Sequence, residues 1–237
     1  MDEDWKDKDE KYKQENHVAF VVGYTGETGK EIVKDLGRRQ VFKKVYLLGR
    51  RMVDLGKDVG PEFEQRIIDF EDLDKSSDVF AEADVGFCTL GTTRKQSGKS
   101  GFIKVDKDFT LNVANVAKQK GCKHFSYCSS YGANANSWFL YMRIKGEVEE
   151  ALKGMGFDKL TIHRPAMLLC DREQPRFGEK FARCIFRPMI ALRPTTGSIP
   201  TSVLARGMVN DVISSDTNDV KTLLNRDIHL MAGNVKK

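Results

Sequence analysis

Tyr141 and Lys145 have the types and spacing of an acid/base pair. They are four residues apart, so a helix would place both side chains on one face. A lysine ammonium beside a phenol stabilises the phenolate and lowers the pKa of a tyrosine from its ordinary value of about 10. Such a tyrosine can exchange a proton with a substrate alcohol or carbonyl. The competing interpretation is a half-buried tyrosine on an amphipathic helix.

Two serines, Ser129 and Ser130, end the apolar run that precedes this pair. A serine hydroxyl at that point would hydrogen-bond the same substrate oxygen that the tyrosine protonates. The sequence leaves both serines open, and we expect Ser130 rather than Ser129 to face the substrate.

A glycine-rich turn with the pattern GxxGxxG lies near the N-terminus, at Gly23, Gly26 and Gly29. It follows the apolar run at residues 18–22 and precedes a helical pattern that ends near Gly37. Glycines in this context let backbone amides approach a pyrophosphate at the helix N-terminus. The turn therefore predicts a dinucleotide site, although an ordinary βα loop has the same spacing.

Arg50 and Arg51 follow the second apolar run, at residues 44–48. An NAD site usually offers a carboxylate here to the ribose 2′-hydroxyl, whereas guanidiniums bind a 2′-phosphate. NADP(H) is thus preferred over NAD(H), with solvated surface arginines as the alternative. Asp69 is either an acceptor for the adenine amino group or a helix N-cap. Gly91, after a later run, would let the backbone pass close to the nicotinamide ribose.

These residues must be positioned by alternating strands and helices. Strands are expected at residues 18–22, 44–48, 66–68, 84–88, 124–128 and 160–163, and the clearest helices at 102–118, 139–153 and 203–212. The alternation predicts an α/β fold of the Rossmann type, with a doubly wound parallel sheet in a single domain.

Three parts of the chain differ in pattern. Residues 1–16 form an N-terminal helix or a tail, and residues 17–165 form the NADP-binding core. Residues 166–237 are a small irregular C-terminal extension that covers the active site and completes the same domain, because ligands of such sheets lie beyond the carboxyl ends of the strands.

Composition excludes several classes of protein. The 237 residues include 39 Lys and Arg and 34 Asp and Glu, a net charge of +5 without a concentrated basic patch for nucleic acid. No stretch approaches the ~20 apolar residues of a transmembrane helix, and no apolar signal segment follows Met1, so we expect an intracellular protein. The five cysteines lack metal-ligand spacing, and no metal is expected.

Together these motifs resemble the atypical branch of the short-chain dehydrogenase/reductase superfamily. The chain is similar, in particular, to the HIV Tat-interacting protein family of oxidoreductase-like tumour suppressors, from about Asn16 to the C-terminus. The likeness is carried by segments 23–29, 48–51, 84–88, 90–94, 121–125, 145–149 and 168–172.

The resemblance implies roles for individual residues. Tyr141 and Lys145 are the acid/base pair. The other implied residues contact the cofactor: Thr25, Gly26, Glu27 and Thr28 at the pyrophosphate, Arg50 and Arg51 at the 2′-phosphate, Leu90 and Gly91 beside it, and Leu168 and Arg176 closing over it. Related enzymes often have asparagine where this chain has Asp106. Because of this difference, no proton relay through that position is carried over to this chain.

The resemblance also implies regulatory biology. The family is associated with apoptosis, with an importin β partner and with a location in the cytoplasm and nucleus or nuclear envelope. Two functions therefore compete: an NADP(H)-dependent reductase of carbonyls, and an interaction protein whose partners recognise the cofactor-bound form. Related enzymes often form a homodimer through helices corresponding to residues 102–118 and 139–153.

Overall fold

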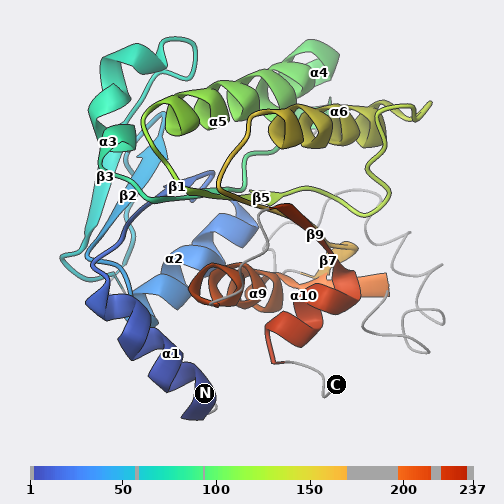
Figure 1. Cartoon of the computed structure of the whole chain (residues 1–237). Helices are drawn as coiled ribbons and strands as arrows, with labels where there is room; N and C mark the ends of the chain where they lie inside the picture. Colours follow the sequence, from blue (N-terminus) through green and yellow to red (C-terminus); the bar gives the residue numbers. More distant parts are fainter. Residues whose placement is uncertain (1–2, 57–58, 93, 170–196, 215–219, 234–237) are drawn as a thin grey trace.

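The computed structural model describes residues 3–56, 59–92, 94–169, 197–214 and 220–233. Its centre is a seven-stranded sheet in the order β3-β2-β1-β4-β5-β6-β9, in which every neighbouring pair is parallel (Figure 1). The strands are β1 (Val18–Val22), β2 (Lys44–Gly49), β3 (Phe63–Ile67), β4 (Val85–Cys88), β5 (His124–Cys128), β6 (Lys159–Arg164) and β9 (Val220–Leu224). A separate parallel pair joins β7 (Met167–Leu169) to β8 (Ser198–Pro200).

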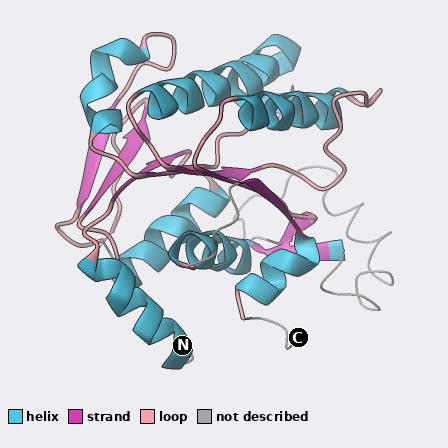
Figure 2. Cartoon of the chain, viewed as in Figure 1, coloured by secondary structure: helices cyan, strands magenta, loops and turns pink. Residues whose placement is uncertain are grey.

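Helices cover both faces of the sheet (Figure 2). One face carries η1 (Leu73–Ser76), α3 (Ser77–Ala81), α4 (Arg94–Ile103), η2 (Lys104–Phe109), α5 (Thr110–Gln119) and α6 (Leu140–Gly154). The other face carries α1 (Glu3–Gln14), α2 (Glu27–Arg39), α9 (Thr201–Ile213) and α10 (Asn225–Met231). This arrangement confirms the predicted Rossmann-type, doubly wound sheet in a single domain.

The apolar run of β1 divides its side chains between two cores. Ala19 and Val21 belong to the cluster under α2 and α9, while Phe20 and Val22 belong to the cluster under α3 and α5. All four side chains are fully buried. Alternation along a strand with both faces covered accounts for this division.

The strand order reverses between β1 and β4. β2 and β3 lie on one side of β1, and β4, β5, β6 and β9 on the other. In an open parallel sheet the crevice at such a reversal, beyond the carboxyl ends of the strands, is the usual place of a ligand.

Several elements differ from the sequence predictions. β3 begins at Phe63, which pairs with Val45, and ends at Ile67; its edge position exposes Arg66 and Ile67, so it lacks the apolar run of the central strands. The helix expected at 102–118 begins earlier, at Arg94, and continues through α4, η2 and α5, with a glycine kink at Gly98.

The ends of the chain complete the fold. In α1, Tyr12 is buried against the core and Asp9 binds the buried guanidinium of Arg39, so the N-terminal helix is docked. β9 adds an edge strand beside β6, which the sequence pattern did not predict because its residues are only partly buried.

Candidate functional site

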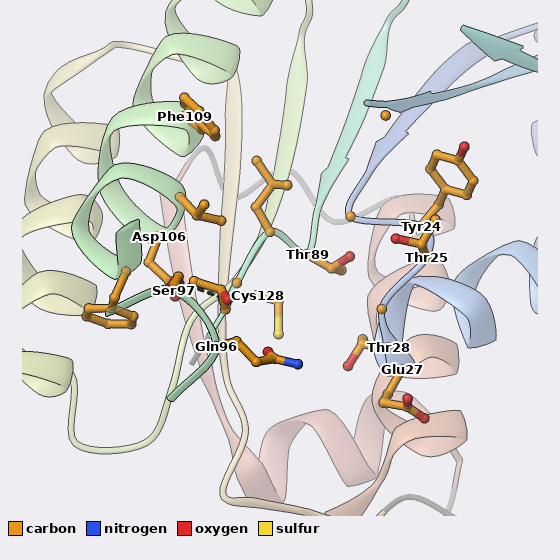
Figure 3. Close-up of a pocket in the computed structure, with 18 of the residues that line it drawn as sticks. Tyr24, Thr25, Glu27, Thr28, Thr89, Gln96, Ser97, Asp106, Phe109 and Cys128 are labelled. Carbon is orange, nitrogen blue, oxygen red and sulfur yellow. Dashed lines mark hydrogen bonds between the residues drawn. The ribbon is translucent and has the colours of Figure 1, made fainter. Parts of the chain in front are cut away.

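A cavity of about 1190 Å³ lies at the carboxyl ends of the strands, where the strand order reverses. It exceeds the roughly 300–1,000 Å³ of most small-molecule pockets, so it has room for a ligand as large as a dinucleotide. Figure 3 shows Thr25 and Thr28 on one side and Gln96, Ser97 and Asp106 on the other. The lining comprises residues 23–28, 48–51, 70, 89–92, 96, 97, 102, 105, 106, 109, 128, 129, 141, 145 and 168.

The turn after β1 requires glycine at two points. Gly23 has φ +81°, and a Cβ there would lie 2.7 Å from the carbonyl carbon of Thr89 at the end of β4. A Cβ on Gly29 would lie 2.2 Å from the carbonyl oxygen of Gly23. Gly23 therefore lines the cavity, whereas Gly29 lies outside the described lining and permits α2 to pack closely on the turn.

The N-terminus of α2 faces the cavity. Its N-cap is Gly26, which offers no side-chain hydrogen bond to the first turn, and Gly26 N–H donates to the Gly23 carbonyl at 2.9 Å. The first amides of a helix lack intrahelical acceptors and carry partial positive charge. Residues 25–28 thus form a cradle that fits a pyrophosphate.

Arg50 and Arg51 lie beyond β2 with exposed side chains that line the same cavity. Neither guanidinium forms an ion pair with a carboxylate of the described residues. The Tyr24 hydroxyl donates a hydrogen bond to the Arg51 carbonyl at 2.9 Å, which fixes the backbone here. Two unpaired guanidiniums at one end of the cavity fit an additional phosphate.

Asp69 lies outside the described lining, although its neighbour Phe70 lies within it. The Asp69 carboxylate accepts the backbone N–H of Glu71 at 2.9 Å. The structure thus has Asp69 in a local turn before η1, whose N-cap is Asp72 rather than Asp69.

At the opposite end of the cavity, Lys145 of α6 is only 3% exposed. Its Nζ lies 3.2 Å from the Tyr127 hydroxyl and 3.3 Å from Asp106 Oδ1. Burial disfavours the ammonium, yet Tyr127, Asp106 and Tyr141 hold the pKa of Lys145 well above its ordinary value. Lys145 is therefore a cation at neutral pH, as the acid/base interpretation requires.

Tyr141 lies one helical turn before Lys145 and lines the cavity. Its ring is 41% exposed, with its centroid 5.9 Å from that of the buried Phe102. The phenol is thus accessible to a substrate, while the other tyrosine near Lys145, Tyr127, is fully buried on β5. Burial raises the pKa of Tyr127, so this phenol stays neutral.

The serine that lines the cavity is Ser129, not Ser130 as expected from the sequence. The Ser129 hydroxyl donates to the buried carboxylate of Glu149, which also binds Arg164. The Ser130 hydroxyl lies 3.4 Å from the Tyr131 carbonyl. Both serines follow the end of β5 at Cys128, and Ser130 lies outside the described lining.

Some lining residues were missed or incompletely assigned by sequence reasoning. Asp106 is one, since only the departure from asparagine marked its position. Cys128 is another: burial raises the pKa of its thiol to about 11, so it is not a thiolate nucleophile at neutral pH. Leu90, Gly91 and Leu168 do line the cavity as expected, and Arg176 lies outside the described residues.

The sheet order, glycine turn and cavity define a Rossmann-type protein with a dinucleotide-sized site at the strand reversal. Comparison with known proteins supports the assignment to Rossmann-type, dinucleotide-binding proteins. The NAD(P)H-binding family matches residues 23–182. UDP-glucose 4-epimerase from Thermotoga maritima superposes with a TM-score of 0.64 at 16% identity, covering 93% of this chain and 84% of that one.

Protein HTATIP2 of Rattus norvegicus is 40% identical over 219 residues, 92% of this chain and 90% of the rat protein. Protein FMP52, mitochondrial, of Candida glabrata is 34% identical over 181 residues, 72% of this chain and 74% of the yeast protein. The chain belongs to the HTATIP2 family of NAD(P)-binding, oxidoreductase-like proteins, which confirms the resemblance seen in its sequence.

Proposed function

We propose that this protein is an NADP(H)-dependent oxidoreductase of the short-chain dehydrogenase/reductase type that reduces a carbonyl or oxidises the corresponding alcohol. The observation that carries the proposal is the single cavity lined by the glycine turn, the arginine pair and the Tyr141–Lys145 pair. An ordinary βα loop or a merely half-buried tyrosine gives no reason for these groups to share one space.

The cofactor-binding roles follow from the cavity. Gly23 and residues 25–28 would hold the pyrophosphate at the α2 N-terminus. Arg50 and Arg51 would bind a 2′-phosphate, which favours NADP(H) over NAD(H). Leu90, Gly91 and Leu168 would border the nicotinamide half.

When bound, the reduced nicotinamide supplies hydride to the carbonyl carbon of the substrate. Tyr141 donates its phenolic proton to the carbonyl oxygen, and the Lys145 ammonium one turn away stabilises the phenolate that remains. Ser129 lines the same end, and its oxygen accepts a hydrogen bond from the product alcohol because its own proton is held by Glu149. The product leaves as the alcohol after Tyr141 regains a proton.

NADPH oxidation across a panel of aldehydes and ketones tests this function. Replacing Tyr141 by Phe removes the proton donor, and the turnover number should fall at least ~100-fold while NADPH affinity stays within about twofold of the wild type. Tyr131→Phe is the matched control, because Tyr131 is 60% exposed and outside the described lining. NADPH binding without turnover of any carbonyl would reject the reductase.

A second function is favoured by a surface feature. Trp138 and Phe139, which directly precede α6, are 97% and 78% exposed, and it is adjoining exposed apolar side chains, rather than single ones, that mark interaction sites. The competing proposal is therefore a cofactor-dependent interaction protein with an importin β partner, as the HTATIP2 family suggests. Titration of importin β with and without NADPH tests it, and equal weak binding in both rejects it.

The proposed compartments are cytoplasm and nucleus, from the family resemblance. Fungal relatives carry "mitochondrial" in their names, which makes the mitochondrion the competing location. Among the described residues, none of the helices combines the length and apolar character that crossing a membrane requires.

A further inference from the structure

One buried carboxylate at the catalytic end of the cavity has no part in the chemistry described so far. Asp106, on η2, is only 1% exposed. Its Oδ1 lies 3.3 Å from Lys145 Nζ, and its Oδ2 accepts the backbone N–H of Thr92 at 2.8 Å. Both oxygens therefore have partners, and one of these partners is Lys145, which the proposed function makes the electrostatic activator of Tyr141.

We propose that the Asp106 carboxylate sets the pH at which the Tyr141/Lys145 pair releases its first proton. The proposal rests on the roles given to Tyr141 and Lys145 in the proposed function. It adds Asp106 as a positioning residue that acts through Lys145 and does not touch the substrate.

The charge balance carries the argument. A carboxylate and an ammonium in contact are together neutral, so the positive field that reaches Tyr141 from Lys145 is opposed by Asp106. Removing the carboxylate leaves the Lys145 ammonium, whose side chain is buried, without an anionic partner. Loss of one proton from the pair then becomes easier, whether Lys145 or Tyr141 gives it up, because the two groups titrate as one coupled system.

The other groups around the Tyr141/Lys145 pair carry no negative charge that could replace that of Asp106. Tyr127 and Cys128 on β5 and Cys88 on β4 face Lys145, and burial raises the pKa of each, so all three are neutral at physiological pH. Asp106 is the carboxylate that the described residues bring within ion-pair distance of Lys145.

Asp106 also links the pair to the backbone that borders the cavity. Through the Thr92 amide it holds the segment that begins with Leu90 and Gly91. The carboxylate uses one oxygen for the ammonium and the other for the amide, whereas asparagine has one acceptor oxygen and no negative charge. Asp106 thus both balances the charge of Lys145 and holds the backbone at Thr92 in place.

The test follows both protons directly. Protein with ¹³C at tyrosine Cζ and lysine Cε is titrated by NMR, and the two resonances are assigned from Tyr141→Phe and Lys145→Met. In Asp106→Asn, the lower of the two midpoints should fall by about one pH unit or more, at least ~10-fold in the dissociation constant. Asp106→Ser supplies a second charge-free variant in case the asparagine does not fold.

Glu147→Gln is the matched control. It removes one negative charge from the same helix, two residues beyond Lys145, where Glu147 binds Lys107 at 2.6 Å outside the described lining. Its midpoints should equal those of the wild type. Midpoints in Asp106→Asn that stay within about 0.3 pH unit of the wild type, or rise, would show that Asp106 is only a structural anchor.

This readout needs neither substrate nor cofactor. A midpoint shift without NADPH turnover would reject the reductase and retain the role of Asp106. NADPH turnover without a midpoint shift would retain the reductase and reject the role of Asp106.

Discussion

The two ends of the cavity satisfy their polar groups in opposite ways. At the phosphate end (residues 23–28, 50 and 51), the α2 N-terminus has no side-chain cap and the guanidiniums form no ion pair with a described carboxylate. At the catalytic end (residues 106, 129, 141 and 145), Lys145 binds Asp106 and Tyr127, and Ser129 binds Glu149. One end has positive charge left for a ligand, whereas the other is already balanced by the protein.

Because of this difference, we expect one end to determine the affinity for the cofactor and the other to determine the protonation of the Tyr141/Lys145 pair. The phosphate end gains most from an anionic ligand, since charge-assisted hydrogen bonds are the strong ones. The catalytic end gains little from ligand charge, and its protonation depends on neighbouring buried groups. Mutations at the two ends should therefore change different measured quantities.

The layers that support the two ends also differ. Behind β1 and β2, side chains such as Val21 and Leu47 pack in an apolar cluster. Behind β5 and β6, the buried side chains under α9 include His124, His163 and Asp211. The support of the catalytic end therefore contains two buried imidazoles, whereas the cluster behind β1 and β2 contains none.

The largest expected effect is at the phosphate end. The double substitution Arg50→Ala with Arg51→Ala should weaken NADPH binding at least ~100-fold, because two charge-assisted contacts are lost and each contributes roughly 1.5–3 kcal/mol. NADH, which lacks the 2′-phosphate, should change less than about threefold. Isothermal titration of both nucleotides measures the two losses. Equal losses of affinity for NADPH and NADH would reject the assignment of Arg50 and Arg51 to a 2′-phosphate.

Arg38→Ala is a matched control for that double substitution. Arg38 has an exposed guanidinium on α2, bound to Asp35 and far from the described cavity lining. Its removal should leave the affinities for both nucleotides unchanged.

The next effect is expected from acid at the catalytic end. Burial lowers the pKa of His124 and of His163 from 6.5 to about 4, with Asp211 opposing the shift and Lys221 adding to it; Lys159 also lowers that of His124. Between pH 6.5 and 4 the unfolded chain binds more protons than the folded one, so stability is complete above pH 6.5 and falls as pH drops toward 4.

From pH 7 to pH 5 the free energy of unfolding should fall by on the order of 4 kcal/mol, about 2 kcal/mol for each of the two imidazoles. Urea denaturation at several pH values measures this slope. His163→Gln should flatten it. A slope that His163→Gln leaves intact would assign acid sensitivity to other groups.

The sequence predicted the phosphate end better than the catalytic end, and the reason is distance along the chain. The turn from Gly23 to Gly29 and the strand before it are consecutive, so their spacing alone specifies a strand, a turn and a helix. The catalytic end joins η2, β5 and α6, and neither the Asp106–Lys145 contact nor the Ser129–Glu149 bond leaves a periodic signal. The doubly wound parallel sheet was predictable from the alternating patterns, but β9 was not, because this edge strand is only partly buried.

The smallest effect concerns the two serines, where the sequence and the structure favour different residues. Ser129 lines the cavity and Ser130 lies outside its described lining. Ser129→Ala removes one neutral hydrogen-bonding group from the substrate side and should lower turnover of an identified carbonyl about threefold to tenfold, the ~0.5–1.5 kcal/mol of such a bond. It should also lower the free energy of unfolding by ~1 kcal/mol, because Glu149 loses a buried donor. Ser130→Ala should change neither quantity. If Ser130→Ala alone lowers turnover, the hydroxyl at the substrate belongs to Ser130, and the Ser129–Glu149 bond serves only to fix the end of β5 against α6.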